Sequence, residues 1–339
     1  MINKLKNSKI AILWYGLEGK SSLQFLLKNW ILSQNITILD KNNIEIQNFD
    51  WKIITWENYL NDLDIYDFII KSPWISPYTN WLLKYKDKLL TQAMIFYSLY
   101  KWKIISITQT KWKSTTATLT YEVLKNAWFK TKLVWNIWNP VLDEIDFNET
   151  YDFVVFELSS YMLEGFENHH SYISIIWNIY EDHLDWHEWF ENYSNAKLNV
   201  LKNAENILVW LNLYHKIENH LLNRKFLSFG WELAYYSHIK NNFFINKTNI
   251  GKNINPKIPG DHNLDNISWI LWVCDIIWVP LYIFEKTINS FEWLNHRLKN
   301  IWTYNWITFI DDAISTTPES TIMWIKSFSW KIDTIFLGW

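Results

Sequence analysis

Glycine is the residue this chain most conspicuously lacks: 339 residues contain 7 glycines, where a typical composition of about 7% would give about 24. Cysteine occurs once, at Cys274, which excludes a disulfide framework and a zinc site built from cysteines. No uninterrupted apolar run reaches about 18 residues, so we expect no transmembrane helix. The first residues, MINKLKNSKIAIL, contain no secretion-signal pattern, which predicts a cytoplasmic protein.

Charge of either sign is also not in excess. The formal net charge is −3 and charged residues make up 20% of the chain, so the composition does not predict a nucleic acid or a membrane as partner. Hydrophobic residues make up 49%, which is typical of a folded protein and excludes disorder and collagen. The length predicts two or three domains.

Tryptophan is as abundant as glycine is rare, with 25 residues. One interpretation is an aromatic-rich binding protein in which every indole is genuine. The other is that a codon specifying glycine in the cell is written here as tryptophan. Location separates the two, because genuine indoles favour buried or stacking positions, whereas glycine favours turns, helix ends and phosphate loops.

The first informative stretch lies near the N-terminus. The apolar run Ile10–Leu13 predicts a strand, and the string WYGLEG that follows becomes GxGxxG if residue 14 is glycine. A helical pattern comes next, and a second predicted strand, Ile36–Leu39, ends at an acidic residue. This order is typical of a Rossmann-type nucleotide-binding unit. The candidate ligand-binding residues here are Trp14, Gly16, Leu17 and Asp40.

A second loop gives a stronger signal. Lys103–Ile107 predicts a buried strand, the polar string TQTKWKSTT follows it, and a helical run comes next. This is the architecture of a phosphate loop, in which backbone N–H groups and a helix N-terminus hold phosphates. A glycine at position 112 suits such a loop, whereas an indole there would fill the space of the phosphate. The candidate ATP-binding residues are Thr110, Lys111, Trp112, Lys113, Ser114 and Thr115, with Lys113 on the β/γ-phosphates and Ser114 or Thr115 on magnesium.

Other tryptophans follow the same pattern. Trp30 and Trp128 stand where a glycine would end a helix, and turn-like strings contain Trp74, Trp135 and Trp138. Trp186, within DHLDWH, is the best candidate for a genuine indole.

With glycine restored at such positions, further motifs follow one another along the chain. They are FELSSYMLE (156–164), NIYEDHLDWHE (178–188), NYSNAKLNV (192–200), PGDHNLDN (259–266), LNHRLKN (294–300) and FIDDAISTTPEST (309–321). Together with the two loops, this ordered set resembles the Mur ligases, the ATP-dependent amino-acid ligases of peptidoglycan assembly. The resemblance runs from about Lys9 to the last residue.

The resemblance implies a metal site and a substrate rim. Glu157 comes directly after an apolar strand, where a carboxylate often binds Mg²⁺, and the family implies two Mg²⁺ ions held by Ser114, Glu157, His183 and a carbamylated Lys197. Lys113, His183 and Lys197 are thereby the catalytic candidates. By the same resemblance the nucleotide contacts Asn263, Asn266, Arg297 and Asp312, and the UDP-sugar substrate faces Asn136 and Ser159.

The expected fold is α/β. We expect a Rossmann-like UDP-substrate domain at 1–95, a central P-loop ATPase domain with a mostly parallel sheet at 96–298, and the start of a Rossmann-like ligase domain at 299–339. The implied reaction is ATP-dependent ligation of D-glutamate to UDP-N-acetylmuramoyl-L-alanine through an acyl phosphate, by a monomer. The printed chain, with Trp112 and with its end at IFLGW, is expected to be inactive and shorter than its family.

The sequence departs from the family pattern at two positions, and it leaves other functions possible. Gln109 replaces a small residue in the phosphate loop, and Met162 stands where the family commonly has glutamine. Another Mur-type or a folylpolyglutamate-type ligase is one alternative, and an aromatic-rich binding protein is a second. An NAD-dependent oxidoreductase would explain the first loop alone.

Overall fold

The structure is a computed structural model that describes most of the chain. The described residues are 1–44, 46, 52–135, 139–144, 146, 148–166, 169–210, 213, 226–229, 236–239, 242–245, 248–249, 254–257, 261–292, 299–313, 321–322, 325–326, 328 and 332–336. The chain divides into two compact units. The first comprises Met1–Thr108, Val134–Ser174 and His183–Glu205, and the second comprises Gln109–Leu133, Ile175–Asp182 and Asn206–Trp339.

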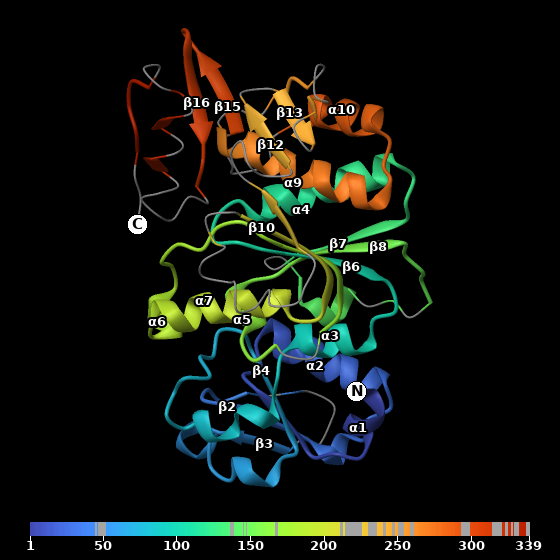
Figure 1. Cartoon of the computed structure of the whole chain (residues 1–339). Helices are drawn as coiled ribbons and strands as arrows, with labels where there is room; N and C mark the ends of the chain where they lie inside the picture. Colours follow the sequence, from blue (N-terminus) through green and yellow to red (C-terminus); the bar gives the residue numbers. More distant parts are fainter. Residues whose placement is uncertain are drawn as a thin grey trace. The chain divides into compact units, whose positions relative to one another are not determined.

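The N-terminal part of the first unit is built on a five-stranded sheet (Figure 1). Its strands are β1 (Ile10–Leu13), β2 (Ile36–Asp40), β3 (Lys52–Thr55), β4 (Phe68–Lys71) and β5 (Leu89–Leu90), in the order β3-β2-β1-β4-β5. All four pairings are parallel. The residues of β1 and β2 are buried throughout, as continuous apolar strands of a parallel sheet should be. The Rossmann-like prediction is confirmed.

Several helices belong to the first unit. They are α1 (Ile2–Lys6), α2 (Leu17–Lys28), α3 (Gln92–Leu99), α5 (Ser160–Leu163), α6 (Leu184–His187) and α7 (Phe190–Leu198), with 3-10 turns at Ser33–Asn35, Trp56–Asn58, Leu63–Ile65, Leu83–Lys88, Val141–Glu144 and Asn199–Leu201. Leu23 and Leu26 of α2 pack with Ile10 and Ile12 of β1 in one apolar cluster. This packing holds the first turn of α2 against the end of β1.

A second, nine-stranded sheet has the hydrogen-bonded order β14-β13-β12-β11-β10-β9-β6-β8-β7. Its strands are β6 (Lys103–Thr108), β7 (Thr131–Val134), β8 (Phe153–Glu157), β9 (Ser171–Ile176), β10 (Ala204–Trp210), β11 (Phe226–Phe229), β12 (Tyr236–Ile239), β13 (Asn242–Ile245) and β14 (Thr248–Asn249). β6 and β8 pair in parallel, as do β10 and β11. From β12 to β14 the pairing is antiparallel.

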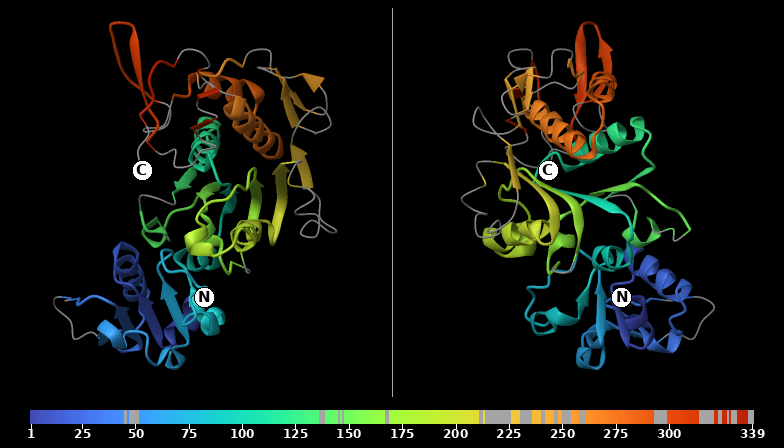
Figure 2. Two further views of the ribbon diagram at one scale, coloured as in Figure 1. Left: turned by 90° about the vertical axis from the view of Figure 1, so that its left-hand side faces the viewer. Right: turned by 45° about the vertical axis from the view of Figure 1, so that its right-hand side comes forward.

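The second unit carries α4 (Lys113–Asn126), α9 (Asp261–Ile277) and α10 (Leu281–Ser290). α4 packs against both α9 and α10 (Figures 1 and 2), and Asn126 Nδ2 donates a hydrogen bond to Thr287 Oγ1 at 3.0 Å. The last described strands, β15 (Lys299–Tyr304) and β16 (Ile307–Asp311), form an antiparallel hairpin. The predicted domain limits and the third Rossmann-like domain stay predictions.

None of the helices in the described part of the chain is long and apolar enough to cross a membrane.

Candidate functional site

The predicted phosphate loop lies where the sequence placed it, between β6 and α4. β6 ends at Thr108, and α4 begins at Lys113. The residue that enters the helix is Trp112, whose backbone is left-handed at φ 67° and ψ 14°. A left-handed residue reverses the chain so that successive N–H groups can turn towards one point, which suits an anion. The strand–loop–helix prediction is confirmed.

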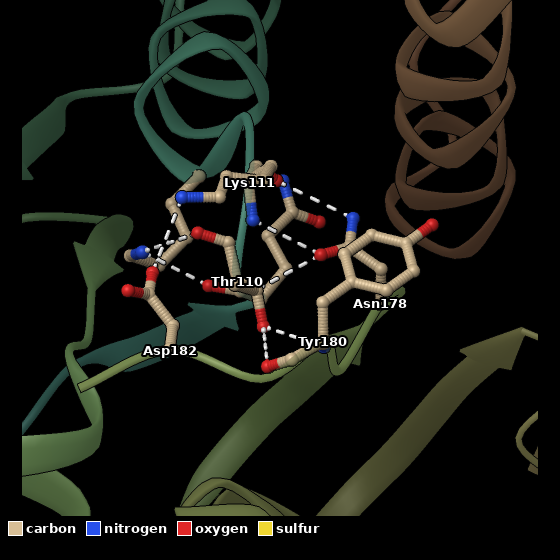
Figure 3. Close-up of polar contacts among 7 residues, drawn as sticks. Thr110, Lys111, Asn178, Tyr180 and Asp182 are labelled. Atoms are coloured by element: carbon tan, nitrogen blue, oxygen red, sulfur yellow. Dashed lines mark hydrogen bonds and ion pairs between the residues drawn. The ribbon is translucent and has the colours of Figure 1, made fainter. Parts of the chain in front are cut away.

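Asn178 anchors this loop, and the sequence did not single it out. The backbone N–H of Thr110 donates to both the carbonyl oxygen and Oδ1 of Asn178, each at 3.0 Å. The N–H of Lys111 donates to the same Oδ1 at 3.0 Å (Figure 3). Asn178 is 5% exposed, so these bonds form away from competing water. Its position at the head of the NIYEDHLDWHE string was the available signal.

The residues after Asn178 reinforce the anchor. The N–H of Tyr180 donates to Thr110 Oγ1 at 3.0 Å, and Lys111 Nζ forms an ion pair with Asp182 Oδ2 at 3.2 Å (Figure 3). The two charged side chains are only 10% and 15% exposed, which weakens solvent screening of the pair. The Lys111 side chain therefore stabilises the conformation of the loop.

Lys113 folds back onto the loop. Its Nζ donates to the carbonyl oxygens of Gln109, at 2.9 Å, and Thr110, at 3.4 Å. The ammonium charge is thus held beside the loop backbone at the start of α4. A positive charge in this position complements phosphate oxygens.

A chain of buried amides and hydroxyls supports the loop from α4 and α9. Gln109 Nε2 donates to Thr116 Oγ1 at 3.0 Å, and that hydroxyl donates to Asn266 Oδ1 at 3.0 Å. Asn266 Nδ2 in turn donates to Asn263 Oδ1 at 3.3 Å. The unusual Gln109 is therefore a structural member of the loop. Asn263 and Asn266 fix the position of α4 through Thr116.

In the first unit, Glu157 ends β8 and Lys197 lies on α7. Both side chains are buried, at 1% exposure. Lys197 Nζ donates to Thr108 Oγ1 at 3.3 Å and lies over the ring of Tyr193, 5.0 Å from its centroid. Thr108 Oγ1 donates to the carbonyl oxygen of Leu158 at 2.8 Å. The hydroxyl of Thr108 therefore links the lysine to the end of β8.

His183 has a left-handed backbone at φ 54°, directly before α6. Its ring lies 5.0 Å from that of Tyr161. Such strain is often found at functional positions. On the same short helix, His187 Nε2 lies 2.9 Å from Ser160 Oγ. Burial, together with the nearby charges of Lys197, His183 and Lys71, lowers the pKa of His187 to about 3, so the ring is neutral at neutral pH.

Ser159 caps α5, because its side chain accepts a hydrogen bond from the N–H of Met162 at 3.3 Å. Met162 is itself buried. Ser159, which the sequence predicts as a substrate contact, is therefore the N-cap of α5.

The first loop has a tightly packed turn. Asp40 Oδ2 accepts from the N–H of Tyr15 at 2.8 Å, which ties the end of β2 to the loop after β1. A Cβ at Gly19 would collide with the carbonyl oxygen of Trp14, which itself has φ 72°. Gly16 is the N-cap of α2, and Leu17, its first residue, is largely exposed. The GxGxxG-like turn is thus present, with a tryptophan at its first position.

A buried lysine, Lys71, is the last residue of β4. Lys71 Nζ donates to the carbonyl oxygen of Ile75 at 2.9 Å. Burial lowers the pKa of Lys71 to about 8, and the charges of Glu164 and Glu18 oppose that shift. Burial also raises the pKa of Glu18 to about 6, although it accepts a hydrogen bond from Ser72 Oγ at 3.0 Å.

Asn136 and Arg297 lie outside the described residues, and Asp312 follows β16. Among the residues that the structure describes, no three His, Cys, Asp or Glu side chains gather as a metal site. The predicted metal set includes a serine and a lysine, so this finding does not test it.

A mostly parallel sheet with a phosphate loop between β6 and α4 defines an α/β protein of the P-loop class. Residues 107–274 match the family described as the Mur ligase middle domain. The chain is 32% identical over 343 residues to the UDP-N-acetylmuramoylalanine--D-glutamate ligase of Francisella tularensis subsp. mediasiatica (strain FSC147), covering 99% of this chain and 74% of that protein. The chain belongs to the Mur ligase family.

Other relatives agree. The enzyme of the same name from Francisella tularensis subsp. novicida (strain U112) is also 32% identical, over 99% of this chain and 75% of its own length. MurF from Acinetobacter baumannii superposes with a TM-score of 0.61 at 14% identity, covering 97% of this chain and 70% of that one. MurF ligase from Thermotoga maritima, in complex with ADP, gives 0.58 at 14%, covering 97% and 73%. At such identities the structures show a shared fold.

Proposed function

We propose that the chain is an ATP-dependent ligase that joins D-glutamate to UDP-N-acetylmuramoyl-L-alanine in peptidoglycan synthesis, in the cytoplasm and as a monomer. The observation that carries the proposal is the 32% identity, over 99% of the chain, to a UDP-N-acetylmuramoylalanine--D-glutamate ligase. The phosphate loop supports it, because such a ligation needs a phosphate donor to activate a carboxylate.

The chemistry proposed has two steps. The L-alanyl carboxylate attacks the γ-phosphorus of ATP and ADP leaves, which gives an acyl phosphate. The neutral amine of D-glutamate then attacks the acyl carbon and inorganic phosphate leaves. The protein contributes by positioning the reactants and by neutralising charge. We assign substrate binding to 1–95, ATP chemistry to 96–298 and the ligase domain to 299–339.

The loop residues fit ATP. Thr110 and Lys111 are held by Asn178 with their backbone fixed, so Trp112 to Thr115 begin α4 in one orientation. The helix N-terminus supplies a positive field for phosphate oxygens. Lys113 Nζ, now on loop carbonyls, would exchange those partners for phosphate. Arg297, Asp312, Asn263 and Asn266 are the remaining nucleotide candidates, with the two asparagines acting through Thr116.

The proposed magnesium ligands are Ser114, Glu157, His183 and a carbamylated Lys197, for two Mg²⁺ ions. The donor set fits a hard cation, because Ser114 supplies a hydroxyl, Glu157 a carboxylate and a carbamate two further oxygens. When bound, magnesium would neutralise charge on the transferring phosphoryl group. Burial of Glu157 and Lys197 would keep water from this chemistry. Trp14, Gly16, Leu17, Asp40, Asn136 and Ser159 are the proposed contacts of the UDP-sugar substrate.

The test is amino-acid-dependent phosphate release by the protein isolated from its own cells. It is incubated with ATP, Mg²⁺ and UDP-N-acetylmuramoyl-L-alanine, and D-glutamate should stimulate release. Parallel reactions supply the other Mur amino acids with their own nucleotide substrates, and L-glutamate with a folate. Stimulation in one of those reactions, without a response to D-glutamate, would replace the proposal by the corresponding ligase.

A further inference from the structure

Tryptophan occupies most of the left-handed backbone positions in the described part of the chain. Twelve non-glycine residues there have positive φ, and seven of them are tryptophan: Trp14, Trp30, Trp56, Trp112, Trp128, Trp278 and Trp306. Four of the other five are Asp, Asn or His, the types that tolerate this region best. A bulky side chain there is a genuine outlier, because its Cβ crowds the backbone.

Three of these seven tryptophans terminate a helix with the same pair of backbone hydrogen bonds. After α2, the N–H of Trp30 donates to Leu27 O at 3.0 Å and that of Ile31 to Leu26 O at 3.1 Å. The same pair of bonds recurs at Trp128 after α4 and at Trp278 after α9. This is the Schellman motif, whose left-handed residue is usually glycine. The hydrogen bonds therefore define three positions for glycine, and each is occupied by tryptophan.

The hairpin gives an independent case. Tyr304 pairs with Ile307, so the turn consists of Asn305 and Trp306, with φ values of 45° and 70°. A two-residue turn with both φ values positive is type I′, for which Asn-Gly is the strongest preference. Asparagine is in its expected place, and tryptophan stands in the place of glycine.

The side chains at these positions gain little from packing. Trp30, Trp128, Trp278 and Trp306 are 84%, 80%, 89% and 99% exposed, although indoles normally contribute by burial. Trp186 behaves differently, since it is 7% exposed and packs against Tyr161 with ring centroids 4.7 Å apart. Backbone geometry thus separates these four tryptophans from Trp186, and their exposure agrees with that separation.

Two of the remaining left-handed tryptophans lie in the two predicted nucleotide loops. Trp14 is the first residue of the GxGxxG-like turn, and Trp112 is the residue before Lys113. The Trp112 indole lies at a tilt against that of Trp177, with ring centroids 5.1 Å apart. Trp56 opens a 3-10 turn and is 64% exposed.

We infer that the protein made in its own cells carries glycine at positions 14, 30, 56, 112, 128, 278 and 306, because the codons for these positions are read there as glycine. The inference depends on backbone geometry alone and does not require the proposed function. The inference applies to these seven positions. Trp186 stays tryptophan, and Trp74 and Trp135 are not included because their φ is not left-handed.

Peptide mass spectrometry of the protein isolated from its own cells tests the inference directly. Peptides that span positions 278 and 306 should carry glycine, and the peptide that spans 186 should carry tryptophan. Tryptophan at 278 or 306 in the native protein would overturn the inference, whatever the protein catalyses.

A stability comparison on recombinant protein tests the physical reason. Trp278→Gly should raise the melting temperature of the printed chain by about 2–4 °C, whereas Trp278→Ala, which also removes the indole but keeps the Cβ, should not. Trp128→Gly and Trp128→Ala should repeat the pattern. An equal gain from alanine, or no gain from glycine, would show that left-handed strain is not the reason for the pattern and would overturn the inference.

A last comparison concerns the phosphate loop and rests also on the proposed function. We define the seven-glycine chain as the one substituted Trp→Gly at all seven positions. It should bind ATP at least tenfold more tightly than the six-glycine chain that keeps Trp112. Equal binding by two folded chains would remove position 112 from the inference, while the peptide masses would still decide the other six.

Discussion

Asn178 holds Thr110 by two hydrogen bonds at once, because the N–H of Thr110 donates to both its carbonyl oxygen and its Oδ1, at 3.0 Å each. The two residues are 68 positions apart in the chain. The shape of the phosphate loop therefore depends on a residue that precedes α6 rather than on the loop sequence alone.

Replacing Asn178 should loosen the loop. In the seven-glycine chain, Asn178→Ala removes the Oδ1 acceptor of the Lys111 N–H, while the Thr110 N–H keeps its bond to the backbone carbonyl of residue 178. The loss should cost about 1–3 kcal/mol of unfolding free energy. ATP affinity should fall as well, and urea unfolding and calorimetry measure the two effects. Asn199→Ala is the control, since Asn199 Nδ2 donates to Leu163 O at 2.8 Å. It should lower stability and leave ATP affinity unchanged.

Lys113 should matter for phosphate binding more than for folding. Lys113→Met in the seven-glycine chain removes a charged donor, and we expect a 10–100-fold rise in the Kd for ATP, because a hydrogen bond from a charged group contributes about 1.5–3 kcal/mol. Lys125→Met, on the exposed side of the same helix, is the matched control. If both variants bind ATP alike, Lys113 does not contact phosphate.

Lys71 should make stability rise at alkaline pH. Its pKa is about 8 in the folded protein and 10.5 in its ordinary state. Between these values the unfolded chain binds the proton and the folded chain has lost it, so the free energy of unfolding increases with pH. The increase should reach about 3 kcal/mol.

The measurement is urea unfolding at several pH values between 8 and 10.5, compared with Lys71→Met. Methionine keeps much of the apolar stem and cannot titrate, so the variant should lose this rise. Identical slopes for the two proteins would mean that burial does not lower the pKa of Lys71.

The contact between Ser160 and His187 should be energetically coupled. Both side chains are buried, and the 2.9 Å hydrogen bond joins α5 to α6. In a double-mutant cycle of Ser160→Ala and His187→Phe, we expect a coupling energy of about 1 kcal/mol. Urea unfolding of the four proteins gives it, and additive losses would show that the bond contributes nothing.

Much of the fold was predictable because short apolar runs fall between turn signals. The strand Ile10–Leu13 has the predicted bounds, and the second strand extends one residue further, to Asp40. The phosphate loop was predictable because its pattern is local. After β10 the sheet changes character, because β12–β14 pair antiparallel whereas β11 joins β10 in parallel.

What the sequence could not give depends on long-range contacts. Asn178 was missed because its partners lie in another loop, and no local periodicity marks them. Gln109 looked like a disturbance of the loop, yet its side chain is fully buried and donates to Thr116 on the following helix. Exposure separates Trp186 from Trp278, and composition counts them equally.

The position of β1 at the middle of the five-stranded sheet has a consequence for biosynthesis. β1 pairs with β2, where Ile10 faces Ile36, and with β4, where Ile10 faces Phe68. Neither partner is joined to β1 by a hairpin, so these contacts are distant in sequence and form slowly. During translation, β1 must therefore wait for the ribosome to release the chain through Lys71 before both of its edges are covered. Until then its unpaired backbone edges and its apolar side chains are open to other chains, which is the interval in which a chaperone would have most effect.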